Sequence, residues 1–143
     1  MSRVEERAPA TFTNTVAMES TLAVTGVTTI TGGLVLGTEA ISAAGAASII
    51  VPVSLVTADA ADMAVTLADG TTAGTVKIFH TVASANSWKV TPATTDGSYT
   101  KVTCTLIGDT VTFLWTGTGW AILSRSSGTA AGATAVVDMP LVA

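Results

Sequence analysis

Side chains that could do acid–base or metal chemistry are few in this sequence, and they match no catalytic or metal-binding pattern. The one histidine, His80, falls in a strand-like stretch, whereas such chemistry needs several convergent His, Asp, Glu or Cys residues. Three aspartates, Asp59, Asp62 and Asp69, are close enough in sequence to reach a calcium ion, but their spacing does not fit an EF-hand loop. The single cysteine, Cys104, lies in an alternating pattern and is expected to be buried and reduced.

Glycine and serine motifs also fail to match a catalytic template. Gly32-Gly33 is not followed by the Lys-Ser/Thr of a phosphate-binding loop. No serine stands in a Gly-x-Ser-x-Gly elbow. A hydrolase acting on a cell-surface polymer therefore has no residue constellation behind it. We predict that the protein is not an enzyme and that it uses no cofactor and no metal.

Charged side chains make up only 11% of the sequence, against about 25% in ordinary soluble domains. The net charge is −4 and the six basic residues are scattered singly, which argues against a nucleic-acid partner because such surfaces cluster Lys and Arg. The uncharged stretch 40–58 contains Pro52 and repeated Ser and Gly, which argues against a membrane span. Residues 1–14 show no secretory signal. We therefore expect a subunit that buries much of its surface in an assembly.

Threonine- and glycine-rich blocks of six fill the region 20–39, which follows a charged N-terminal arm at 1–19. The blocks are TLAVTG, VTTITG and GLVLGT, and their alternation of apolar and small polar residues is typical of short strands between tight turns. Such strands bury an apolar face only by stacking or by winding with other chains, so we predict a shaft or oligomer interface here; the alternative is an ordinary pair of strands in one sheet. The interface residues are Leu22, Val24, Ile30, Leu34 and Leu36.

A compact β-domain is predicted for residues 48–125, after an Ala/Gly-rich connector at 40–47. About seven strand-like runs are separated by turn signals such as Asp69-Gly70, with connections short enough for antiparallel pairing. The expected fold is all-β, an antiparallel β-sandwich or jelly-roll-like domain. The tail, 126–143, begins with small residues and ends in an apolar run, which predicts a docking arm or a disordered tail. The apolar residues of that arm are Val136, Val137, Met139 and Leu141.

Four aromatic side chains of this domain have two interpretations. Trp115 and Trp120 flank a Gly-Thr-Gly turn, so they are expected to pack across a hairpin, in the core or in an interface. Aromatic rings near loops can also stack on sugars, but clustered Asp, Asn or Gln residues are missing beside these, which favours the core. The candidates for surface recognition are Trp88, Tyr99, Trp115 and Trp120.

The sequence resembles a β-domain that recurs in virion proteins of tailed bacteriophages. The similar stretches are LADGTTAGTVKIFHTV (67–82), WKVTPA (88–93) and CTLIGDTVTFLWTGTGWAIL (104–123). In addition, STLAVTGVTTITGGLVLG (20–37) resembles the Thr/Gly-rich repeats that precede such domains in phage fibre and capsid-surface proteins. The resemblance covers roughly residues 20–124.

This resemblance implies an assembling structural protein, because proteins of this type are commonly trimers. Short ones resemble capsid decoration (cement) proteins, which sit where major capsid subunits meet and brace the shell. A chain of 143 residues with one repeat region fits that class. We therefore expect a homotrimer on the capsid surface of the virion, with the major capsid protein as partner. The alternative is a head or tail fibre or spike module that binds a host receptor or glycan.

Overall fold

The computed structural model describes residues 27, 29, 32–128 and 141–142. The chain divides into two units, Met1–Leu34 and Val35–Ala143, and all the described strands lie in the second unit. The predicted arm, 1–19, and most of the predicted strand repeats, 20–39, lie outside the described residues. The fold given below is therefore that of the second unit.

The described part of the chain is all-β, which confirms the predicted fold class. The described residues contain no helix, and therefore no helix that is long and apolar enough to cross a membrane. The described strands are β1 (Thr38–Ile41), β2 (Gly45–Ala47), β3 (Val53–Ala58), β4 (Met63–Leu67), β5 (Val76–Ser84), β6 (Trp88–Pro92), β7 (Val102–Cys104), β8 (Thr110–Trp115), β9 (Trp120–Ser126) and β10 (Leu141–Val142).

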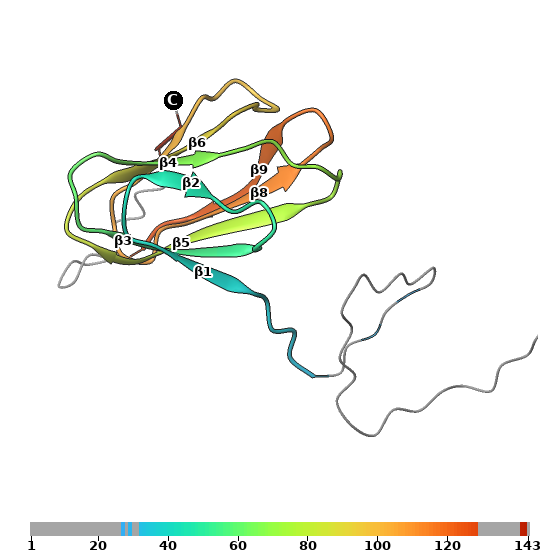
Figure 1. Ribbon diagram of the computed structural model, residues 1–143, viewed down its shortest axis with the longest axis horizontal. Coiled ribbons are helices and arrows are strands. Elements are labelled where there is room, and N and C mark those ends of the chain that lie inside the picture. The colour runs from blue at the N-terminus through green and yellow to red at the C-terminus, as the bar shows by residue number, and fades with distance from the viewer. Residues whose placement is uncertain (1–26, 28, 30–31, 129–140, 143) are drawn as a thin grey trace, which may run out of the picture. The chain divides into compact units, whose positions relative to one another are not determined.

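These strands form two five-stranded sheets (Figure 1). The first sheet has the order β1-β3-β5-β8-β9, and the second has the order β10-β7-β6-β4-β2. Along the chain, β1 to β6 alternate between the two sheets, so that each pair of consecutive strands adds one strand to each sheet. The strands of successive pairs run parallel, β1 beside β3 beside β5 and β2 beside β4 beside β6. The later strands add antiparallel to both sheets.

The prediction of purely antiparallel pairing is wrong for the first six strands. The Asp69-Gly70 turn, which was interpreted as a hairpin turn, instead lies in the link that carries the chain from β4 in the second sheet to β5 in the first. The links 48–52 and 59–62 also cross between the sheets. A short link and an alternating pattern are common to both arrangements, so the sequence pattern does not separate them. The predicted connector at 40–47 also differs from the structure, because it supplies the end of β1 and the whole of β2.

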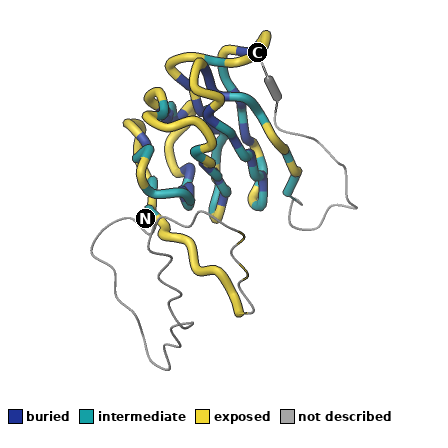
Figure 2. Tube along the Cα trace, turned by 90° about the vertical axis from the view of Figure 1, so that its right-hand side faces the viewer, coloured by how far each residue is buried: buried dark blue, intermediate teal, exposed yellow. Residues whose placement is uncertain are grey.

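The core lies between the two sheets, where alternate residues of β3, β4, β6, β7 and β8 are buried (Figure 2). β3 and β8 both follow a strict alternation of half-buried and buried residues, as strands with one face on a core do. Aromatic rings form the centre: Phe79 and Phe113 meet edge to face at 6.0 Å between centroids, and Trp120 packs against Phe113 at 6.5 Å. This aromatic centre joins strands that are distant in sequence.

A buried carboxylate fixes the end of the domain where β9 leaves it. Asp109 accepts hydrogen bonds from the backbone N–H groups of Thr105, Leu106 and Gly128, at 2.8, 3.0 and 2.8 Å. Gly128 lies so close to this loop that a Cβ atom there would stand 1.6 Å from the carbonyl oxygen of Ile107. Only glycine fits at that position without a shift of the backbone.

Candidate interaction surfaces

The titratable residues singled out from the sequence do not meet in the structure. His80, on a face of the first sheet, places Nδ1 2.8 Å from the hydroxyl of Thr110. No group of three or more His, Cys, Asp or Glu side chains converges among the described residues. Cys104 is buried and free, and burial, reinforced by the charge of Asp109, raises the pKa of its thiol far above the ordinary value. Such a thiol is protonated at neutral pH and is a poor nucleophile.

The four aromatic residues considered for surface recognition are core residues, so the prediction of a surface role for them is wrong. Trp88 and Trp120 are fully buried, and Tyr99 and Trp115 are 8% and 6% exposed. The polar atoms of three of the rings are satisfied inside the domain: Trp88 Nε1 donates to the Thr81 hydroxyl at 2.9 Å, Trp120 Nε1 donates to a backbone carbonyl at 2.9 Å, and the Tyr99 hydroxyl donates to the Trp120 carbonyl. A ligand has no access to their faces.

The predicted interface and arm residues are only partly within the described chain. Leu22, Val24, Ile30, Val136, Val137 and Met139 lie outside the described residues. Leu34 and Leu36 belong to no strand and are 67% and 40% exposed. Leu141 lies in β10, which pairs antiparallel with β7 of its own chain. The end of the predicted docking arm thus adds a strand to its own second sheet.

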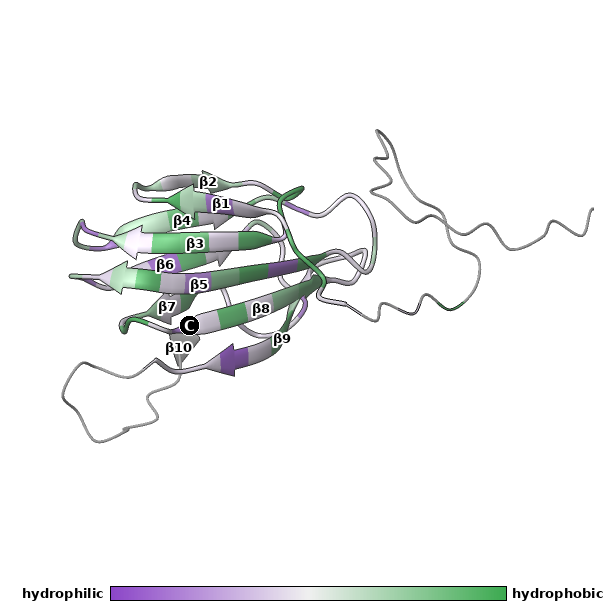
Figure 3. Cartoon of the chain, turned by 90° about the horizontal axis from the view of Figure 1, so that it is seen from below, coloured by the Kyte–Doolittle hydropathy of each residue, from purple (hydrophilic) through white to green (hydrophobic). Residues whose placement is uncertain are grey.

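The outward positions of β3, β5 and β8 in the first sheet are aliphatic except for Thr57, His80, Thr110 and Thr112, and this face was not predicted from the sequence. We call it the aliphatic face; its central residues are Val53, Leu55, Val76, Ile78 and Leu114. They occupy the half-buried or exposed positions that alternate with core residues along β3, β5 and β8. Figure 3 shows the hydropathy of the residues along these strands. No Asp, Glu, Lys or Arg occupies an outward position among these three strands. The sequence contained a sign of this face, because Val76, Ile78 and Val82 are apolar on one alternation of residues 76–82 and Phe79 is apolar on the other.

The outward face of the second sheet is different in chemistry. Its outward positions on β4, β6 and β7 are small or polar, and one of them is charged. They are Ala64, Thr66, Lys89, Thr91 and Thr103. This is the alternation expected of a sheet with one face in water. The domain therefore has one face suited to solvent and one suited to a partner.

An ion pair between β1 and β5 lies between the two sheets. Lys77 Nζ is hydrogen-bonded to Glu39 Oε1 at 2.6 Å and to the Val51 carbonyl oxygen at 2.7 Å, and its side chain is 1% exposed. Ser54 and the backbone N–H of Ser48 also donate to the Glu39 carboxylate. Burial opposes ionisation of this carboxylate, but these hydrogen bonds and the lysine charge outweigh burial and hold the pKa of Glu39 below its ordinary value. The network ties β1, β3 and β5 together.

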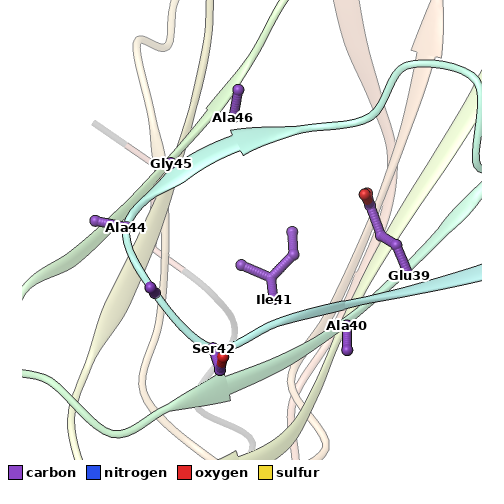
Figure 4. A pocket seen from close by; sticks show the side chains of 8 residues that line it. Glu39, Ala40, Ile41, Ser42, Ala44, Gly45 and Ala46 are labelled. Carbon is purple, nitrogen blue, oxygen red and sulfur yellow. The ribbon is translucent and has the colours of Figure 1, made fainter.

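A recess of about 320 Å³ lies at the β1–β2 end of the domain, lined by residues 39–46. Glu39 and Ile41 point into it and Ala40 points away (Figure 4). The rest of its lining is small, with Ser42 and Gly45 among alanines. The recess is open, since β1 and β2 are the last strands of their sheets at this end.

Comparison with known proteins adds no family to this description. No protein-family model matches the chain, and no curated protein matches it. The chemistry of the surfaces therefore decides which function the domain supports best: the aliphatic face and the open β1–β2 end are suited to protein partners.

Proposed function

We propose that this protein is a structural virion subunit, a capsid decoration protein of the tailed-bacteriophage type that forms a homotrimer and braces the shell against which it packs. The aliphatic face is the observation that carries the self-assembling part of this proposal. The viral part is supported by the resemblance of residues 67–123 to phage virion β-domains. The partner is then the major capsid protein, and the location is the capsid surface.

The aliphatic face is costly to leave in water. Val76 and Val82, both on β5, are 39% and 43% exposed, and buried aliphatic surface contributes about 25 cal/mol per Å². Because no outward position of β3, β5 or β8 is charged, this face can pack against the surface of a sister subunit without desolvating an ion of its own. Burial of this face in a contact between subunits is therefore favourable.

The size of this face explains why further contacts are needed. Three strands about 4.8 Å apart, with roughly six residues each rising 3.3 Å, cover about 290 Å². A stable interface of standard size buries about 800 Å² on each partner. The face alone supplies roughly a third of that area, so a lasting complex also needs contacts to the shell, where several weak sites on one oligomer act together.

The alternative is a fibre or spike module that binds a host receptor or glycan. The aromatic residues that supported this alternative are not at the surface. The rings of Trp88, Tyr99, Trp115 and Trp120 are buried. No other observation in the described chain favours a sugar site over a protein partner.

A charge placed in the aliphatic face tests self-assembly. Leu55 pairs across the sheet with His80 at the middle of the face, so Leu55→Glu introduces a charge that an apolar contact would have to bury. The matched control is Thr66→Glu, an exposed position on the outward face of the second sheet. By multi-angle light scattering we expect trimers for the wild type and Thr66→Glu, and folded monomers for Leu55→Glu. A wild type that is monomeric at high micromolar concentration contradicts the proposal.

Binding to shells tests the viral part separately. Purified protein is mixed with expanded and unexpanded capsids of the virus that carries the sequence, and the capsids are sedimented. We expect co-sedimentation with expanded capsids only, with saturation at a fixed number of copies. Absence of co-sedimentation with both, for a protein that is trimeric in solution, rejects the decoration role and leaves self-assembly standing.

A further inference from the structure

The aliphatic face carries one titratable side chain. His80 is the only histidine of the chain, and it occupies a half-buried outward position in the middle of β5. The strand register places it in a row of outward residues that crosses the whole first sheet and holds no Asp, Glu, Lys or Arg. The row is Ala40, Leu55, His80, Thr110 and Ser126. The surface that the proposed self-assembly buries therefore has an imidazole at its centre.

The charged residues of the first sheet lie on the opposite alternation from His80. Glu39 on β1 and Lys77 on β5 occupy inward positions and are bonded to each other at 2.6 Å. Arg125 on β9 is paired with Val111, a buried core residue. Asp109, just before β8, is buried, and its carboxylate accepts hydrogen bonds from backbone N–H groups. Within the described strands of this sheet, no charged position thus faces the imidazole.

The hydrogen bonds of Thr110 determine which nitrogen of His80 takes up a proton. The Thr110 hydroxyl donates its single hydrogen to the carbonyl oxygen of Gly108 at 3.1 Å. It can then only accept from His80, so Nδ1, at 2.8 Å, carries the hydrogen of the neutral ring. Nε2 is the nitrogen that gains a proton in acid. The neutral ring keeps its Nδ1 bond within its own sheet, whereas the protonated ring has a full charge and a second N–H group.

Burial of the face distinguishes the two forms of this ring. A charge that is buried without a partner is strongly disfavoured, whereas a neutral polar group with its hydrogen bond made is tolerated. Histidine side chains titrate near pH 6.5 in peptides, and no other side-chain type of this sequence has its ordinary titration between about pH 5.5 and about pH 7.5. The Cys104 thiol is further from this range still, because burial raises its pKa. A pH change within the range therefore acts on the aliphatic face through His80.

We propose that His80 makes assembly through the aliphatic face dependent on pH, because the neutral ring can be buried against a sister subunit and the protonated ring opposes that contact. The inference rests on the proposed self-assembly and adds a regulation of the same surface. Its sign follows from linkage. Association has its full strength where the free ring is neutral, and it weakens as the pH falls, because free subunits then hold a proton that the assembled ones exclude. Between pH 7.5 and pH 5.5 the effect is about tenfold for each buried ring, and about a thousandfold for a trimer that buries three.

Sedimentation equilibrium of the full chain at about pH 7.5, 6.5 and 5.5 tests this dependence. We expect the formation constant of the wild-type trimer to fall about a thousandfold across the range. His80→Gln keeps a polar group beside Thr110 but cannot be protonated, so its constant should change by less than about tenfold. The matched control combines His80→Gln with Thr66→His, which returns a histidine to an exposed outward position of the second sheet, and it should behave like His80→Gln. Circular dichroism at each pH verifies folding, and His80→Leu is the second variant if His80→Gln does not fold.

The outcomes separate this inference from the proposed function. A wild type that is trimeric with the same formation constant at all three pH values overturns the inference and leaves self-assembly intact. The same holds if His80→Gln keeps the pH dependence of the wild type, or if Thr66→His restores it. A wild-type constant that rises as the pH falls also overturns the inference, because a carboxylate of the sister subunit then faces the ring. A wild type that is monomeric at every pH overturns both proposals.

Discussion

The buried ion pair between Glu39 and Lys77 makes the sharpest prediction for stability. Glu39→Gln keeps the shape of the side chain and an acceptor for Ser54, but removes the charge that compensates Lys77, whose side chain is 1% exposed. Removing one partner of a buried pair costs about 3–5 kcal/mol. Because Glu39 itself is 22% exposed, water relieves part of this cost, so we expect the free energy of unfolding to fall by about 3 kcal/mol, at the low end of that range.

The corresponding fall in melting temperature is about 12 °C, since roughly 4 °C accompanies each kcal/mol in a domain of this size. Differential scanning calorimetry measures it, with Asp59→Asn as the control at an exposed carboxylate. A double-mutant cycle with Lys77→Met isolates the pair: the double variant should lose about 2 kcal/mol less than the sum of the two single variants. A Glu39→Gln protein within about 0.5 kcal/mol of the wild type would refute the reasoning.

The same pair fixes a pH dependence whose sign follows from the lowered pKa of Glu39. A carboxyl group with a folded pKa below its unfolded value stabilises the fold above that unfolded value, and this contribution is lost as the pH falls through the folded pKa. The wild type should therefore lose stability as the pH falls below about 4.5, the ordinary value. Glu39→Gln should lack this part of the acid sensitivity. The stability of both proteins is measured as the pH is lowered. If it falls with the same slope in the two proteins, the assignment to Glu39 is contradicted.

Three further predictions concern the interior of the domain. Gly128→Ala should destabilise it by about 1–3 kcal/mol in urea unfolding, because the new Cβ atom overlaps the carbonyl of Ile107; Gly45→Ala, where a Cβ meets nothing within 4 Å, is the control, and equal midpoints would refute the close approach. Cys104 should react with a thiol reagent at least about a hundredfold more slowly in the folded protein than in urea, because its buried thiol has a raised pKa; equal rates would place it at the surface. The three tryptophans, all buried, should emit at short wavelength and resist quenching by iodide, and efficient quenching would show that a ring is exposed.

The sequence predicted the strands better than their pairing. Turn dipeptides and alternation predicted about seven strands in residues 48–125, where the structure has the seven strands β3 to β9, because a half-buried strand leaves that pattern whichever neighbour it has. Which strand pairs with which depends on whether a short link bends back within a sheet or crosses to the other one. The Asp69-Gly70 turn fits a hairpin and a crossing between sheets equally well, so the parallel pairing of the first six strands was not predictable from it.

The interaction surfaces were harder to predict for a related reason. Aromatic residues were the candidates for surface recognition. Trp88 and Trp120, however, are large enough to fill the space between the sheets and are buried there. The residues left outside, such as Leu55 and Ile78, are ordinary aliphatic side chains that look like core. Only the pairing register shows that they share a face and that this face lacks charge. Glu39 and Lys77 are thirty-eight residues apart, and nothing local predicts that they meet.

The parallel pairing of the first six strands also constrains how the chain folds. Parallel neighbours are separated by a strand of the other sheet, as β4 separates Val53 in β3 from Ile78 in β5. They can pair only after the chain has crossed to the other sheet and back. β5 takes part in both kinds of pairing, because it pairs parallel with β3 and antiparallel with β8. Loop closure of this length slows folding into the millisecond-to-second range for all-β domains. Refolding should therefore begin at the local β8–β9 hairpin and β5, with β1 and β2 consolidating last.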